Sequence, residues 1–360
     1  MQDVLKYLRR EITERGARIT GCDEKFEGAM EIPSRLDGAA VVEIGEEAFS
    51  KKPSLTSVAI PDSVEVVGEA AFAFCDGLKE LRLGRGVKKI EIGAFWGCSS
   101  LKSVVIPGSV EVVGYGAFAE CDGLNELRLG RGIKKIETGA FRECNSLKSV
   151  VIPGSVEVVG NAAFGGCSGL QELRLGTGIK TIEFGAFAKC DSLKLVAIPD
   201  SVEVVGKAAF AECGRLQELH LGAGIKKIET AAFSRCQSLK RVAVPDSVED
   251  VGELAFFECS ELEELQLGAG IKRIEFGAFA SCSSLKNVEI PSTVESVGGG
   301  AFTGCSKLEE LHLGAGIKRI EEGAFRDCSS LRRVVLPSPL EAFARDAFVE
   351  SVVLVVDNER

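Results

Sequence analysis

Residues 101–124 read LKSVVIPGSVEVVGYGAFAECDGL. The stretch opens with the apolar spacing L-x-x-V-x-I, turns at Pro107 and ends in A-F-x-x-C-x-x-L. Its phenylalanine belongs to a series with an unbroken period of 23 residues: Phe49, Phe72, Phe95, Phe118, Phe141, Phe164, Phe187, Phe210, Phe233, Phe256, Phe279, Phe302, Phe325 and Phe348. A length of 360 residues would ordinarily suggest two or three domains. A short fixed period predicts instead a single solenoid of about fourteen coils.

Each coil is expected to contribute one strand from its L-x-x-L-x-L segment, and the strands to stack into a parallel sheet with a spacing of about 4.8 Å. The coils alternate between two types. One ends its strand with Ile-Pro, as at Ile106-Pro107, and the other with Leu-Gly, as at Leu83-Gly84. Proline lacks an amide donor and glycine admits unusual backbone angles, so both residues can turn the chain out of the strand.

The pattern resembles the BspA-type leucine-rich repeat family, whose repeats run L-x-x-[LV]-x-[IL]-P-x-S-V-x-x-I-G-x-x-A-F-x-x-C-x-x-L, over about residues 38–350. The resemblance implies a β-rich, right-handed leucine-rich-repeat solenoid with a parallel β-sheet on its concave face and about fourteen coils of 23 residues. It also implies a binding architecture associated with adhesion to host proteins on bacterial and protozoan surfaces.

The ends depart from the repeat, as the ends of a solenoid must if its core is to be covered. Residues 1–37 are predicted to form an N-terminal cap, with an amphipathic helix over 1–16 (Val4, Leu5, Leu8, Ile12) and an imperfect first coil after it. The repeat solenoid is assigned to 38–336, and a C-terminal capping repeat and tail to 337–360.

Twelve of the thirteen cysteines also follow the 23-residue period, each three positions after a phenylalanine: Cys75, Cys98, Cys121, Cys144, Cys167, Cys190, Cys213, Cys236, Cys259, Cys282, Cys305 and Cys328. Their uniform place predicts small, buried, reduced side chains rather than a metal or redox array. Cys22 stands outside the series and is the better candidate for a reactive thiol. A second series alternates glutamate and lysine, beginning Glu65, Lys88, Glu111, Lys134, and predicts stacked opposite charges along one edge.

The composition limits the classes of partner that the protein is expected to bind. The 43 basic and 53 acidic side chains give a net charge of -10, which disfavours nucleic acid. No apolar run is long enough for membrane insertion. The first residues carry charge throughout and show no secretory signal, which predicts a cytoplasmic protein from the sequence as given, or an extracellular or cell-surface one if a signal peptide has been removed.

The sequence contains no recognisable pattern of catalytic residues, so it predicts a protein that is not an enzyme, with no cofactor and no metal. Only two histidines exist, His220 and His312, and four coils separate them. The Gly84-Arg85-Gly86 turn and its copies match no phosphate-binding motif. Phe74 and Trp96 are expected to be neighbours on the outer face, as a local packing pair or a partner contact.

The strand face is the informative surface, because the third and fifth positions of L-x-x-L-x-L should point to solvent. The predicted binding residues combine the fifth positions of five successive coils with two turn arginines: Arg82, Val105, Arg128, Val151, Arg174, Arg85 and Arg131. Glu80, Glu126 and Glu172 at the third positions could instead neutralise the arginines by pairing within each strand. Two interpretations fit this pattern. The face is either a docking strip for an extended acidic and apolar segment or a self-paired surface that was copied when the repeat was duplicated.

The function predicted from these observations is a non-enzymatic protein- or peptide-binding scaffold that acts through the concave face. One alternative is a secreted or surface adhesin that binds host or neighbouring-cell proteins. The other is a self-associating structural protein.

Overall fold

The computed structural model describes residues 4–336, 342–343, 346–348 and 353–356. It is a β-solenoid of about fourteen turns, and its only described helix is the short 3-10 segment η1 (Val4–Tyr7). The chain divides into two compact units, 1–179 and 180–360, and each is described by itself. Among the described residues, no helix combines the length and the apolar character that a membrane span requires.

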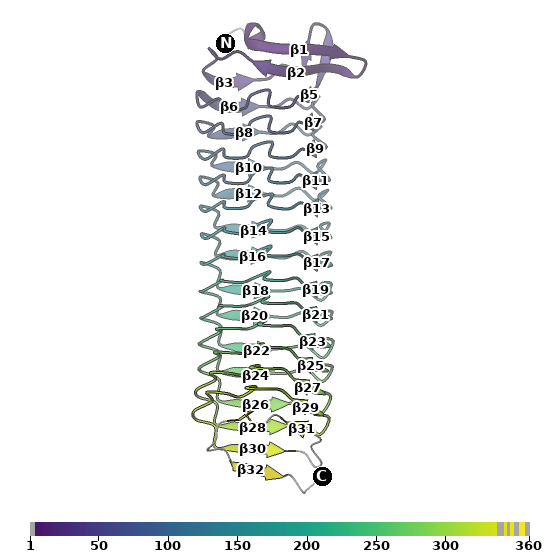
Figure 1. Cartoon of the computed structure of the whole chain (residues 1–360). Helices are drawn as coiled ribbons and strands as arrows, with labels where there is room; N and C mark the ends of the chain where they lie inside the picture. Colours follow the sequence, from purple (N-terminus) through teal and green to yellow (C-terminus); the bar gives the residue numbers. More distant parts are fainter. Residues whose placement is uncertain (1–3, 337–341, 344–345, 349–352, 357–360) are drawn as a thin grey trace. The chain divides into compact units, whose positions relative to one another are not determined.

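The N-terminal unit carries two columns of parallel strands (Figure 1). The first column contains β3 (Gly28–Glu31), β6 (Leu55–Ala59), β8 (Glu80–Arg82), β10 (Ser103–Val105), β12 (Glu126–Arg128), β14 (Ser149–Val151) and β16 (Glu172–Arg174). The second contains β5 (Ala39–Ile44), β7 (Val66–Val67), β9 (Lys89–Ile90), β11 (Val112–Val113), β13 (Lys135–Ile136) and β15 (Val158–Val159). From β5 and β6 onward, paired residues are 23 positions apart, as in Val105 with Arg128, so these coils lie in register, whereas β3 pairs with β6 at intervals of 27 or 28 residues.

The C-terminal unit repeats this arrangement. Its first column contains β18 (Leu195–Ala197), β20 (Glu218–His220), β22 (Arg241–Ala243), β24 (Glu264–Gln266), β26 (Asn287–Ile290), β28 (Glu310–Leu313), β30 (Arg333–Leu336) and β32 (Val353–Val356). The second contains β17 (Thr181–Ile182), β19 (Val204–Val205), β21 (Lys227–Ile228), β23 (Asp250–Val251), β25 (Arg273–Ile274), β27 (Ser296–Val297), β29 (Arg319–Ile320) and β31 (Ala342–Phe343). Most of the predicted C-terminal cap at 337–360 lies outside the described residues.

The phenylalanines form the core of both units. Successive rings stack with centroids 4.8 to 5.5 Å apart in the N-terminal unit and 5.2 to 5.5 Å apart in the C-terminal unit. The cysteines lie beside them, and thiols such as that of Cys121 donate to the carbonyl of the phenylalanine 26 residues earlier, at 3.2 Å for Phe95. All thirteen cysteines are buried and unbridged. The prediction of small, reduced core side chains is confirmed.

The predicted N-terminal helix is wrong. After η1 the chain forms β1 (Leu8–Thr13), which pairs antiparallel with β2 (Gly16–Cys22), and β2 pairs in parallel with β5. A short ribbon of β4 (Arg35–Leu36) pairs with β5 as well. Stacked coils end in unpaired backbone amides and carbonyls, which a strand can satisfy and a helix cannot.

The predicted charge series forms only in part. Lysine and glutamate one coil apart make ion pairs at Lys88–Glu65 (2.9 Å), Lys226–Glu203 (2.8 Å) and Lys318–Glu295 (3.2 Å). All of these side chains are largely exposed, and exposed pairs contribute about 0 to 1 kcal/mol each. The series therefore supports the register of the coils more than it stabilises them.

Candidate functional site

The strand face of the N-terminal unit is formed by the first column of strands, and its middle residues alternate in burial as the sequence predicts. In β10, β12, β14 and β16 the third and fifth positions of the motif are exposed and the residue between them is buried. Val105 is 57% exposed and Val151 is 58% exposed, although each has a side chain that a core would normally accept. The fifth positions thus place arginine and valine in alternation on an open surface.

The five predicted arginines are unpaired. Among the residues that the structure describes, no acceptor lies within hydrogen-bond or ion-pair distance of the guanidinium group of Arg82, Arg85, Arg128, Arg131 or Arg174. Other arginines of the chain do have carboxylate partners, as in Arg142–Glu120 at 3.0 Å and Arg273–Asp250 at 2.7 Å. The arginines of the strand face therefore have hydrogen-bonding capacity that the described chain leaves unused.

The expected neutralisation by Glu80, Glu126 and Glu172 does not occur in the structure. All three glutamates are exposed, but none forms an ion pair with the arginine of its own strand among the described residues. In the C-terminal unit the equivalent positions do come together, as at His312–Glu310 (3.6 Å). Self-pairing is therefore not a property of the N-terminal strand face.

Two surface grooves gather most of the predicted residues. One has a volume of about 530 Å³ and is lined by Arg82, Arg85 and Val105 together with Leu81, Leu83, Pro107, Gly108 and Ser109. The other, of about 500 Å³, is lined by the residues 46 positions later: Leu127, Arg128, Leu129, Arg131, Val151, Pro153, Gly154 and Ser155. We call them groove 1 and groove 2. Arg174 is exposed on the same face and lines neither groove.

The Pro-Gly-Ser turns that form one wall of each groove were not predicted from the sequence. Their serines are fixed, because Ser109 Oγ donates to the Val87 carbonyl at 2.6 Å and Ser155 Oγ donates to the Ile133 carbonyl at 2.7 Å. The signal that could have identified these walls is the glycine after the proline, since three other coils have aspartate there: Asp62, Asp200 and Asp246.

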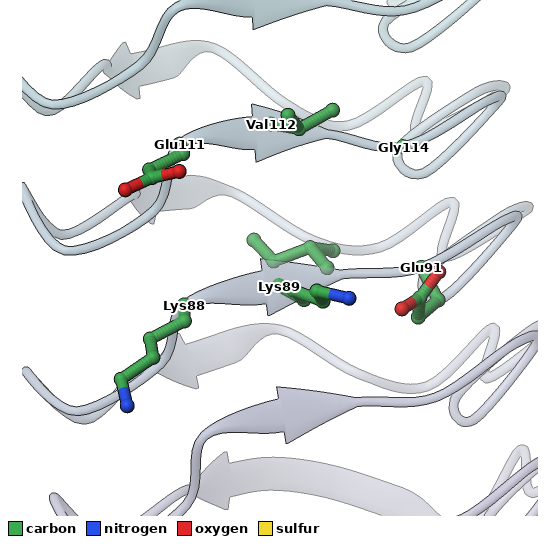
Figure 2. Close-up of a pocket in the computed structure, with 7 residues that line it drawn as sticks. Lys88, Lys89, Glu91, Glu111, Val112 and Gly114 are labelled. Atoms are coloured by element: carbon green, nitrogen blue, oxygen red, sulfur yellow. The ribbon is translucent and has the colours of Figure 1, made fainter.

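A third groove, of about 410 Å³, lies on the second column of strands at β9 and β11 (Figure 2). Lys88, Lys89 and Glu91 line it from one coil and Glu111 from the next, together with Ile90, Val112 and Gly114, so charges of both signs lie at the opening. Lys88 is already paired with Glu65 of the preceding coil. The mixed and partly satisfied charges favour no single class of ligand.

The remaining candidates for chemistry do not assemble. No group of three or more His, Cys, Asp or Glu within the described residues is placed to hold a metal ion. Cys22 is buried, and burial raises the pKa of its thiol, which is the opposite of what a reactive cysteine needs. The prediction of a reactive thiol there is wrong. Phe74 and Trp96 are neighbours, with ring centroids 6.4 Å apart, as a local packing pair requires.

Comparison with known proteins assigns the repeat. A model of the BspA type leucine rich repeat region matches residues 42–171, 159–275 and 251–355. A leucine-rich repeat protein from Bacteroides ovatus is similar in structure, with a TM-score of 0.73 and 29% identity over 99% of this chain and 100% of that one. A leucine rich cell surface protein from Faecalibacterium prausnitzii has a TM-score of 0.52 and 26% identity, over 91% of this chain and 92% of that one.

The pneumococcal vaccine antigen PcpA shares the fold, with a TM-score of 0.53 and 18% identity over 98% of this chain and 94% of that one. A search of curated proteins returns no significant match. The matched model describes a leucine-rich repeat and the similar solved structures include leucine-rich repeat proteins, in agreement with the prediction from the 23-residue period.

Proposed function

Because the chain belongs to the BspA-type leucine-rich repeat family, we propose that it is a non-enzymatic scaffold that binds a protein or peptide through the strand face of its N-terminal unit. The binding residues are Arg82, Val105, Arg128, Val151, Arg174, Arg85 and Arg131. Surface complementarity is sufficient for this role, and no cofactor takes part in it.

The observation that carries the proposal is the set of five unpaired arginines beside exposed valines. A guanidinium group presents five donors in a planar fork, and charge-assisted hydrogen bonds to carboxylates are about twice as strong as neutral ones. Arginine is also enriched among the residues that dominate the energy of protein interfaces. An apolar residue on every second coil supplies contact area between the charged groups. The preferred partner is therefore an extended segment that is both acidic and apolar.

The test is a cross-linking capture from the source organism's extract and surroundings, with the wild type compared with the triple variant Arg82→Glu, Arg128→Glu, Arg174→Glu. A matched control carries three charge reversals on exposed lysines elsewhere in the same unit: Lys51→Glu, Lys89→Glu and Lys134→Glu. Both variants are first matched to the wild type in thermal stability. The proposal requires a specific partner that the arginine variant loses and the lysine variant keeps. Equal capture by both variants would place the binding site elsewhere.

A second candidate function is a surface adhesin that binds a host or neighbouring-cell protein. The observation that favours it is the similarity to the Faecalibacterium prausnitzii protein, which is a cell surface protein. Surface proteolysis of intact source cells tests the idea directly. Protection of the protein from added protease, with cleavage only after lysis, would argue against this role.

A further inference from the structure

The turn after each strand of the first column carries a second series of residues with the 23-residue period, and in the N-terminal unit it runs Asp62, Arg85, Gly108, Arg131, Gly154, Thr177. Where the series holds aspartate, the carboxylate accepts a hydrogen bond from the backbone amide of the next coil. Asp62 Oδ1 lies 2.7 Å from Arg85 N. The C-terminal unit repeats this contact at Asp200 with Ala223 N (2.8 Å) and at Asp246 with Ala269 N (2.7 Å). The turn therefore contains a defined position for a carboxylate.

The same position is vacant where the series holds glycine. Gly108 and Gly154 have no side chain to offer, and no acceptor among the described residues bonds the backbone amides of Arg131 and Thr177. A Cβ atom built on Gly108 would meet nothing within 4 Å, and one on Gly154 would make only ordinary contacts, the nearest with Thr177 Oγ1 at 3.7 Å. Neither glycine is thus required by packing, and the space beside each one is open.

The vacant position beside Gly108 lies among arginines. Arg85 is one coil before it and Arg131 one coil after it, while Arg82, Arg85, Val105 and Gly108 together line groove 1. Among acidic residues, Asp62 is already bonded to the Arg85 amide, and Glu80 and Glu126 lie on the strands outside the groove. An anion there would meet the unused amide of Arg131, and the unpaired guanidinium groups of Arg82 and Arg85 line the same groove.

We propose that the position beside Gly108 binds a carboxylate side chain of the partner, and that the position beside Gly154 binds a second one. This inference rests on the proposed function and specifies the chemistry of its ligand. A carboxylate fits because the aspartates of the equivalent turns place that group against the same amide. At Asp62, Asp200 and Asp246 a carboxylate of the chain itself accepts a hydrogen bond from the amide of the next coil. Where glycine replaces aspartate, a carboxylate of the partner can accept that hydrogen bond instead.

The spacing of the two positions selects the conformation of the partner. They are two coils apart, which corresponds to about 10 Å at the spacing of paired strands. In a β-strand, side chains on one face recur at about 6.6 and 13 Å, so neither interval matches. In a polyproline II segment, residues i and i+3 share a face at about 9.3 Å. Among extended conformations, the spacing therefore favours a polyproline II partner with acidic residues three positions apart.

The experiment measures fluorescence anisotropy of a labelled peptide of repeated Glu-Pro-Pro units against the full chain. The informative variants are Gly108→Asp and Gly154→Asp, because each restores the aspartate of the other coils, fills the vacant position and supplies the missing acceptor. Ser292→Asp is the matched control, since it introduces aspartate at a position of the same series in the C-terminal unit. Each glycine variant should keep the wild-type melting temperature and bind the peptide about tenfold more weakly, a change equivalent to about 1.4 kcal/mol. Ser292→Asp should bind as the wild type does.

Three results would overturn the inference. Wild-type affinity of both glycine variants would exclude the vacant positions as the site. Equal or tighter binding of a Glu-Pro repeat would exclude the three-residue spacing, and preference for a phosphoserine-Pro-Pro repeat would exclude a carboxylate ligand. The broader proposal is separable from these results, because a captured partner that requires Arg82, Arg128 and Arg174 would still support strand-face binding even where no Glu-Pro-Pro peptide binds.

Discussion

The buried cysteines are expected to lower the free energy of unfolding as the pH becomes alkaline, and the size of this effect can be calculated for Cys121. The side chain is fully buried, and burial raises the pKa of its thiol from 9.0 to about 12. Between these values the unfolded chain releases the thiol proton while the folded chain keeps it. The contribution of the thiol is therefore fully present below about pH 9 and is lost as the pH rises towards 12. At pH 10 the loss is about 1.4 kcal/mol for this thiol alone.

Replacing Cys121 by alanine removes that dependence. At pH 8 the variant is expected to be less stable than the wild type by roughly 1 kcal/mol, because a small buried group and its hydrogen bond to the Phe95 carbonyl are lost. At pH 10 the difference should shrink by about 1.4 kcal/mol, so the two proteins become nearly equal in stability. Only the change in this difference is informative, since the wild type and the variant share every other ionisable group.

The assay is urea denaturation of the wild type and Cys121→Ala at pH 8 and pH 10, with a reductant present to prevent disulfide formation in the unfolded chain. Asn125→Ala is the control, because Asn125 is exposed, belongs to the same coil and does not titrate. Its effect on the free energy of unfolding should be the same at both pH values. A stability difference between the wild type and Cys121→Ala that stays constant from pH 8 to pH 10 would show that burial does not raise the pKa of this thiol.

Three further outcomes are expected. Phe118→Ala should lower the free energy of unfolding by about 3 to 5 kcal/mol, because a fully buried ring stacked on both faces is removed. Tyr115→Ala in the same coil should lower it by under about 1 kcal/mol, because Tyr115 is 49% exposed. Urea denaturation of both variants measures the difference. A thiol-specific reagent should label no cysteine of the folded protein and all of them in urea, since every thiol is buried; rapid labelling of the native protein would contradict the described core. Lys226→Gln should leave thermal stability almost unchanged despite the 2.8 Å pair with Glu203, because both side chains are largely exposed. A clear loss in thermal denaturation would show that the charge series is a main source of stability.

Much of the fold could be predicted because every coil has the same length. A constant 23-residue period leaves one register in which Phe118 stacks between Phe95 and Phe141, and the structure has that register. The exposure of Val105 and Val151 followed from the alternation of side chains along a strand. The family also followed from the sequence, since the motif quoted from residues 101–124 lies within a matched region.

The N-terminal cap could not be predicted by the same argument. The spacing of Val4, Leu5, Leu8 and Ile12 suits a helix, yet only Leu8 is buried, and Ile12 is 52% exposed on strand β1. Whether these residues form a helix or a strand depends on the open backbone edge of the first coil, and the local spacing of apolar residues carries no information about that edge. An open sheet edge favours another strand over a helix because only a strand can continue the ladder of hydrogen bonds.

The amino-acid sequence alone predicts the repeat, the register, the buried phenylalanine and cysteine series and the stripe of arginine and valine, because each follows from the period of the coil and the alternation of the strand. Which of these residues act together depends on how the coils pack. The fold leaves Arg82, Arg128 and Arg174 unpaired among the described residues although a glutamate lies two positions before each, and it places Gly108 between Arg85 and Arg131 beside an amide without an acceptor. Arg85, Gly108 and Arg131 are 23 positions apart in the sequence and become neighbours only because each coil packs on the next.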